Sequence, residues 1–202
     1  MYRIFLLVLL FPFLAIAQVV KDNSAGIDPD KMKIDKNIFR VLLSLSTDTK
    51  FSITGSYERE IKRPLTVFFK AGPAIDRASQ GTDVNGTEQY RYIFNAIASG
   101  ELRYYYNLNR RARLEKTIRN FSAFYLSIEE QLVSKPVFIM NKTGTEVLKG
   151  RTSAFVNIGY QYQKNTTFYN IYFGTRFPGQ IYSNIPVGIE LLHGGITVGR
   201  AF

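Results

Sequence analysis

Beyond residue 36 the chain alternates apolar and polar residues with a period of two. Phe39, Val41 and Leu43 alternate with Arg40 and Ser44, for example. This is the pattern of β-strands whose two faces meet different surroundings. Eight such runs can be placed, at residues 38–46, 51–61, 65–76, 90–106, 121–132, 153–163 and 167–177 and in a last run closing at Phe202. No convincing helical periodicity interrupts them, so the sequence predicts an all-β fold.

The lengths of the connections decide the class of β-protein. If the first strand runs outward, the inner connections are residues 62–64, 107–120 and 164–166, and the outer ones are 47–50, 77–89, 133–151 and 178–186. Two inner connections are tight and three outer ones are long, which is typical of outer-membrane barrels. Aromatic residues gather near both ends of the runs, where girdles would lie. We therefore predict an eight-stranded antiparallel transmembrane β-barrel over residues 37–202.

The first residues have the character of a secretory signal. Arg3 precedes an apolar run over residues 4–14, and Ala15-Ile16-Ala17 is a small-x-small cleavage site. The apolar run is too short for a stable membrane-spanning helix, although an uncleaved anchor helix is the alternative. We predict a signal peptide at 1–17 and a polar lead at 18–36. The chain contains no cysteine, which excludes a lipoprotein anchor and disulfide stabilisation.

The net charge of +10 raises the possibility of nucleic-acid binding. Export argues against it, and the charges are interleaved with apolar residues along the chain, so we expect no nucleic-acid partner. The polar faces of the predicted strands carry charges of both signs. Because isolated charges in a narrow barrel would be costly, we expect them to pair. The expected lumenal network consists of Arg40, Glu58, Glu101, Arg103, Glu129 and Arg176. It would be structural, with an ion path or gate as the alternative.

The chain beyond the predicted signal peptide resembles a known family over most of its length. The chain is similar to the small outer-membrane β-barrel proteins common in Bacteroidetes-type bacteria through residues 101–111 (ELRYYYNLNRR), residues 120–127 (NFSAFYLS) and the closing aromatic Phe202. The resemblance implies the fold and an outer-membrane location, with little agreed activity. Arg200 departs from the lipid-facing alternation, but an arginine near a rim snorkels at a cost of about 0–1 kcal/mol.

The inner connection is strongly basic. It contains Arg110, Arg111, Arg113, Lys116 and Arg119. These residues would form a solvated turn, or meet anionic headgroups or a periplasmic partner. On the other side, residues 133–151 could extend as a hairpin in which Val137, Ile139 and Val147 flank a turn at 141–144, with exposed apolar residues that suggest a protein contact surface.

Candidate chemistry is sparse. His193 is the only histidine, expected at the outer rim, with Glu190 and Ser183 close in sequence. No nucleophile elbow or paired-acid pattern accompanies it, so we expect no enzyme and no cofactor. Metal binding is equally poorly supported, because residues 83–88 (DVNGTE) resemble a calcium loop only faintly and Asn85-Gly86 is more simply a tight turn.

The sequence therefore predicts an integral barrel of the bacterial outer membrane with a structural or accessory role, as a subunit of a larger outer-membrane complex. The expected partners are outer-membrane lipids, the barrel-assembly machinery during insertion, and that complex. The alternatives are a narrow pore for ions or small solutes, a rim-site lipid-modifying enzyme, and a soluble secreted ligand-binding barrel.

Overall fold

The structure, a computed structural model, describes residues 34–47, 49–82, 86, 88–140, 149–177 and 192–202. The signal peptide predicted at 1–17 and most of the polar lead predicted at 18–36 lie outside the described residues. So do Ser183, Glu190 and residues 83–85 and 87 of the faint calcium loop.

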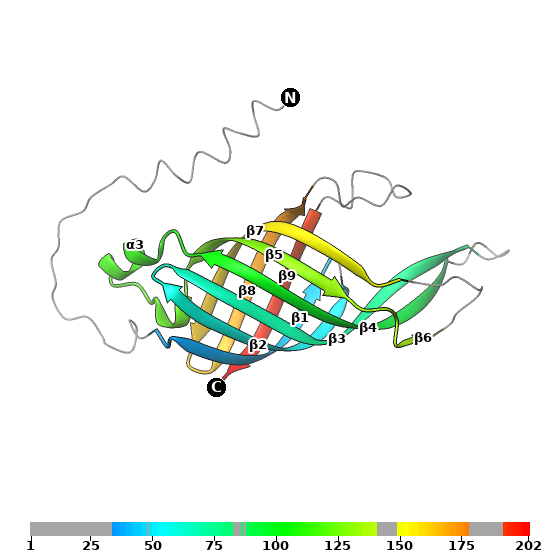
Figure 1. Ribbon diagram of the computed structural model, residues 1–202, viewed down its shortest axis with the longest axis horizontal. Helices are drawn as coiled ribbons and strands as arrows, with labels where there is room; N and C mark the ends of the chain where they lie inside the picture. The colour runs from blue at the N-terminus through cyan, green and yellow to red at the C-terminus, as the bar shows by residue number, and fades with distance from the viewer. Residues whose placement is uncertain (1–33, 48, 83–85, 87, 141–148, 178–191) are drawn as a thin grey trace, which may run out of the picture.

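Nine strands and two short helices make up the described chain. They are β1 (Asn37–Ser46), β2 (Phe51–Lys62), β3 (Leu65–Thr82), β4 (Glu88–Tyr104), α3 (Leu108–Arg113), the 3₁₀ helix η2 (Arg119–Phe121), β5 (Phe124–Val133), β6 (Phe138–Met140), β7 (Arg151–Lys164), β8 (Thr167–Arg176) and β9 (Leu192–Ala201) (Figure 1). Neither helix is long and apolar enough to cross a membrane.

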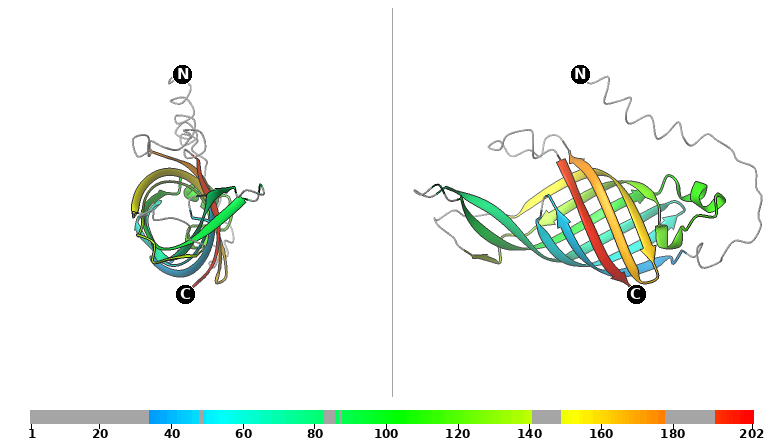
Figure 2. Two further views of the ribbon diagram at one scale, coloured as in Figure 1. Left: turned by 90° about the vertical axis from the view of Figure 1, so that its right-hand side faces the viewer. Right: turned by 180° about the vertical axis from the view of Figure 1, so that it is seen from behind.

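Eight of the strands close into a ring. Each pairs antiparallel with its neighbours in the order β1, β2, β3, β4, β5, β7, β8, β9, and β9 returns to β1. Viewed along its length, the sheet encircles one lumen (Figure 2, left). The prediction of an eight-stranded antiparallel barrel is confirmed. Closure leaves the ring without a free edge, so the strand backbones are hydrogen-bonded all round it.

The ring has an inner and an outer face because successive side chains of a strand point to opposite sides. In β1 the even-numbered residues point inward, and Ile38, Arg40 and Leu42 among them are buried. Val41 and Leu43, at odd positions, point outward, and each keeps 50% of its surface exposed. The same alternation runs through β2, β5, β7 and β8. The faces assigned from the sequence pattern match it.

One end of the barrel carries α3, the β2–β3 turn and the β7–β8 turn, and we call it the inner end; the opposite end is the outer end. The C-terminus lies at the inner end, where the Ala201 N–H donates to the Thr166 carbonyl (2.7 Å) in the β7–β8 turn. The β2–β3 and β7–β8 connections are tight, as the sequence predicted.

At the outer end, β3 continues six residues past the predicted run 65–76, and β4 begins two residues before the predicted run 90–106. They continue together past the other strands, through the pairs Arg77–Tyr92 and Thr82–Glu88 (Figure 1). The hairpin expected over residues 133–151 is described only in its first arm. That arm, β6, pairs with β4 through Ile93 and Ile139, whereas residues 141–148 lie outside the described residues.

The inner connection between β4 and β5 contains α3 and η2, so the expectation of no helix is wrong here. A six-residue helix is too short to show apolar periodicity, and helices of this length form through tertiary packing rather than intrinsic propensity. Leu108 at its start is buried, whereas Arg110 and Arg113 are exposed.

Candidate functional site

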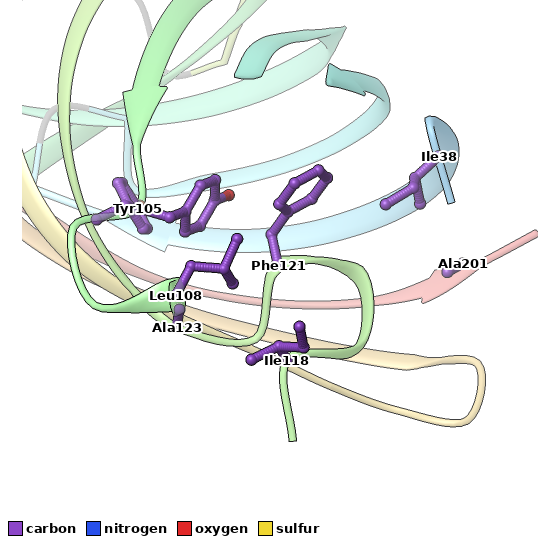
Figure 3. Close-up of a cluster of buried hydrophobic side chains, with 8 residues drawn as sticks. Ile38, Tyr105, Leu108, Ile118, Phe121, Ala123 and Ala201 are labelled. Carbon is purple, nitrogen blue, oxygen red and sulfur yellow. The ribbon is translucent and has the colours of Figure 1, made fainter. Parts of the chain in front are cut away.

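The inner end of the lumen is closed by an apolar plug. Tyr105 and Phe121, both fully buried, stack with ring centroids 5.1 Å apart. Leu108 and Ile118 pack with them, together with residues of the surrounding strands (Ile38, Ala123, Tyr125 and Ala201). Figure 3 shows the connection turning back on itself so that Leu108 and Phe121 lie beside Tyr105. The connection therefore fills the barrel end rather than hanging free in solvent.

An unusual backbone holds the plug in place. Asn120 and Phe121 have φ values of 45° and 64°, in the left-handed region. This conformation is rare for a bulky residue and costs about 1–3 kcal/mol. Hydrogen bonds support it: the Asn120 side-chain oxygen accepts from the Asp35 N–H (3.1 Å), and the Asn120 carbonyl accepts from Gln161 (3.0 Å). Burial of the Phe121 ring offsets the remaining cost.

Directly above the plug lies the first charged cluster, centred on Glu58. Arg40 Nη1 lies 2.8 Å from Glu58 Oε2, and neither side chain is exposed. Glu58 also accepts hydrogen bonds from Thr66 (3.0 Å), Tyr105 (2.6 Å) and Gln161 (3.1 Å). A buried carboxylate with this many donors is well satisfied, which is what a charge in a low-dielectric lumen requires.

Arg103 forms the second cluster. Its Nη2 lies 2.5 Å from Glu101 Oε2, and its Nη1 donates to Gln161 Oε1 (2.8 Å). The guanidinium also lies over the Phe68 ring, 3.7 Å from the centroid, a cation–π contact that a desolvated lumen strengthens. Since Gln161 accepts from Arg103 and donates to Glu58, this one amide joins the two clusters.

Glu129 forms the third cluster, farther toward the outer end. Lys70 Nζ lies 3.0 Å from Glu129 Oε1, and Asn157 donates to Oε2 (3.1 Å). His193 Nε2 lies 3.6 Å from Oε2. The expectation of a rim histidine is wrong: His193 is 1% exposed, points into the lumen from β9 and stacks on Phe155 with centroids 3.8 Å apart.

The six residues expected in one lumenal network are thus all buried in the lumen. Gln161 links four of them (Arg40, Glu58, Glu101 and Arg103), whereas Glu129 and Arg176 have other neighbours. Arg176, the sixth, is 7% exposed and lies 5.5 Å from the Phe155 ring centroid. Pattern reasoning missed Gln161, which has no charge, and left Lys70 outside the network although its position faces inward. It also missed the plug, because the predicted runs 90–106 and 121–132 placed Tyr105 and Phe121 in strands, whereas both lie in the connection between β4 and β5.

Little empty space remains between the clusters. A cavity of about 10 Å³ lies among Lys70, Glu101, Glu129 and their neighbours, enough for about one water molecule. Within the described residues, no group of three or more His, Cys, Asp or Glu side chains is placed to hold a metal ion. The lumen as described is a packed polar core.

The residues of the basic inner connection have different surroundings. Arg110, Arg113 and Lys116 are exposed. Arg111 is partly buried and donates from two nitrogens to the Thr117 carbonyl (2.9 and 3.1 Å), and Arg119 is partly buried in η2. The predicted basic turn is therefore only in part a freely solvated surface.

The closing residue, Phe202, lies at the inner end with 76% of its surface exposed. Its N–H donates to the Phe39 carbonyl (3.0 Å), which ties the terminus to β1. Arg200, exposed on β9, lies 6.0 Å from the Phe202 ring centroid.

No protein-family model and no curated protein matches the chain. Among solved structures, it is similar to the crystal structure of the N-terminal β-barrel domain of Pseudomonas aeruginosa OprF, with 11% sequence identity and a TM-score of 0.43. The match covers 84% of this chain and 100% of the other.

Proposed function

We propose that the protein is a non-enzymatic integral β-barrel of the bacterial outer membrane with a structural or accessory role, as a subunit of a larger outer-membrane complex. The main evidence for insertion into a membrane is the composition of the outward face of the ring. Large aliphatic side chains stand exposed on strands all round it (Leu43 50%, Ile53 44%, Leu102 44%, Ile128 56%, Ile158 47%, Ile171 54% and Ile196 56%).

This distribution is the reverse of that in a soluble barrel, which packs its apolar face inward. Here the charged pairs lie inside and the aliphatic rows face out. In water the outward rows would cost roughly 25 cal/mol for each Å² of apolar surface. In hydrocarbon they cost nothing, and closure satisfies the strand backbone. These features support a membrane over the soluble ligand-binding alternative.

Aromatic residues at the inner end also support this orientation in a bilayer. Phe39 and Tyr57 have ring centroids 4.8 Å apart, and Phe124 and Tyr160 have centroids 4.7 Å apart, all on the outward face. Amphipathic rings at this level form the girdles of membrane barrels. The barrel-assembly machinery during insertion and outer-membrane lipids afterwards are the partners that this proposal requires.

The plug and the packed clusters favour an accessory role over a pore, because Tyr105 and Phe121 occupy the inner end of the lumen. A rim-site enzyme is not favoured either, since His193 is buried beside Glu129. The role as a subunit rests on the outward face itself, where a groove along Gly55, Ala71 and Ala98 interrupts the aliphatic band.

The test is purification of the mature chain without detergent, followed by refolding into lipid vesicles and flotation. We expect aggregation in plain buffer, flotation with the vesicles, and no steady conductance in planar bilayers. A soluble monomer in buffer would overturn the membrane assignment, and a steady large conductance would overturn the accessory role in favour of the pore.

A further inference from the structure

Small residues form a strip across part of the outward face of the barrel. Gly55 on β2 pairs with Ala71 on β3, and Ala71 pairs with Ala98 on β4, so three small residues stand side by side across the sheet. Gly100 follows two positions farther along β4. Large aliphatic and aromatic side chains flank this strip on the outward face. The strip itself has no large side chains, so a shallow groove of about 730 Å³ lies over it. The groove is lined by aromatic and aliphatic residues (Phe39, Tyr57, Phe69, Leu132 and Phe202).

A carboxylate stands in this groove. Glu130 on β5 is exposed on the outward face, and its neighbours across the sheet are Gly100 on β4 and Ala154 on β7. Among the described residues, no lysine, arginine or histidine forms an ion pair with Glu130. Its neighbours along the outward face of β5 are Ile128 and Leu132, which are 56% and 50% exposed.

The position of Glu130 along the barrel places it within the hydrocarbon. It follows Phe124 of the inner aromatic girdle by six residues, which corresponds to about 15 Å along the barrel axis for a strand tilted by about 40°. An apolar band about 25 Å tall then extends some 10 Å beyond it toward the outer surface. An ionised carboxylate facing lipid at that depth is unfavourable, so its presence calls for a partner.

We propose that this groove docks a second membrane-embedded protein whose apolar surface presents one lysine or arginine at the depth of Glu130. The proposal rests on the membrane insertion proposed above and names the surface through which the barrel would join a larger complex. Small residues let a partner's backbone approach closely, and a charge pair in hydrocarbon gives that approach its register.

Two other occupants fit the observations less well. A lipid amine would lie at the headgroup level, about 10 Å from Glu130, given the depth above. A second copy of this chain offers no match, because the exposed basic residues on the described strands, such as Arg59, Arg77 and Arg200, lie toward strand ends. Copies in the same membrane share the same depths, so none of these cations meets Glu130.

The experiment measures association in phosphatidylcholine vesicles with two synthetic transmembrane helices of leucine and alanine. One carries a single lysine one-third of the way along its length, and the other has leucine at that position. Because the chain has no cysteine, a single Lys50→Cys substitution in the exposed β1–β2 turn takes a donor dye, and the helices carry the acceptor. Flotation and folded mobility in cold gels first establish that each barrel variant is inserted.

We expect the barrel to bind the lysine helix at least tenfold more tightly than the leucine helix, and Glu130→Gln to remove that difference. Filling the groove with Ala98→Phe should weaken binding of both helices, whereas Ile171→Phe on the opposite strand β8 should change neither. Equal binding of the two helices by the inserted wild type would overturn the proposal, as would self-association of the barrel that Ala98→Phe abolishes. A barrel that fails to float would instead contradict the membrane assignment.

Discussion

Arg40 and Glu58 form a diagonal pair across adjacent strands. Arg40 is the register partner of Ser56, and Glu58 that of Ile38, yet their charged atoms lie 2.8 Å apart with both side chains fully buried. The diagonal lets Glu58 meet donors from β3 and the plug as well as from β1. The inner end of the lumen is therefore organised around one carboxylate.

Removing the cation of this pair should destabilise the barrel. Breaking one side of a buried ion pair costs about 3–5 kcal/mol, and we expect Arg40→Met to lower the free energy of unfolding by about 3 kcal/mol because Glu58 keeps its other donors. Urea titration in vesicles, followed by circular dichroism, measures this.

The double variant Arg40→Met/Glu58→Gln is the matched comparison. It removes both charges while leaving an acceptor for Thr66 and Tyr105, so it should be more stable than Arg40→Met alone. If the double variant were the less stable of the two, the pair would not be the interaction that the Arg40 substitution breaks.

The plug should contribute to the stability of the barrel. Phe121→Ala removes a ring that is 0% exposed and should lower the free energy of unfolding by about 3 kcal/mol or more. Phe124→Ala, three residues on but 42% exposed on the outward face, is the control and should lower it markedly less. Urea titration in vesicles compares the two variants, and equal losses would show that the Phe121 ring is not part of a packed plug.

The loss of stability caused by a charge on the outward face should depend on how deep in the membrane the charge lies. Ile171→Arg places a cation in the middle of β8 and should lower stability in vesicles by about 2–4 kcal/mol. Arg200→Leu, near the inner rim, should change it by about 1 kcal/mol or less. Unfolding in urea compares the two, and identical small effects would argue that lipid does not contact β8.

Tyr105 in the plug should make the free energy of unfolding depend on pH in the alkaline range. Burial raises the pKa of the Tyr105 hydroxyl well above its ordinary value of 10.0, and the nearby Glu58 charge raises it further. The folded chain then keeps a proton that the unfolded chain loses above pH 10, so stability falls as the pH rises beyond that value. One such group contributes at most about 1.4 kcal/mol per pH unit.

Tyr105→Phe isolates this contribution. The variant should be less stable than the wild type at pH 8, because Glu58 loses a donor, but its stability should fall less steeply between pH 10 and 11. Parallel pH profiles for the two proteins would exclude Tyr105 as a source of the dependence.

The strands and their faces could be predicted from the sequence because each rests on local alternation. Val41 and Leu43 face out and Arg40 faces in by a period of two, whatever the neighbouring strands are. The tight turns at the inner end followed from the spacing of the runs for the same reason. The extension of β3 beyond residue 76 and the pairing of β6 with β4 did not, because each depends on pairing with another strand.

The sequence by itself determined that the chain would be an antiparallel barrel with an apolar outside and a charged inside, because a period of two separates the two faces of each strand and the asymmetry of the connection lengths favours a membrane barrel. Only the tertiary structure decided which charges meet, that His193 points inward, that α3 and η2 close the lumen, and that Gly55, Ala71 and Ala98 stand in one row. Those relationships depend on strand register and barrel closure, which bring together residues far apart in the chain and are set by packing across the whole ring.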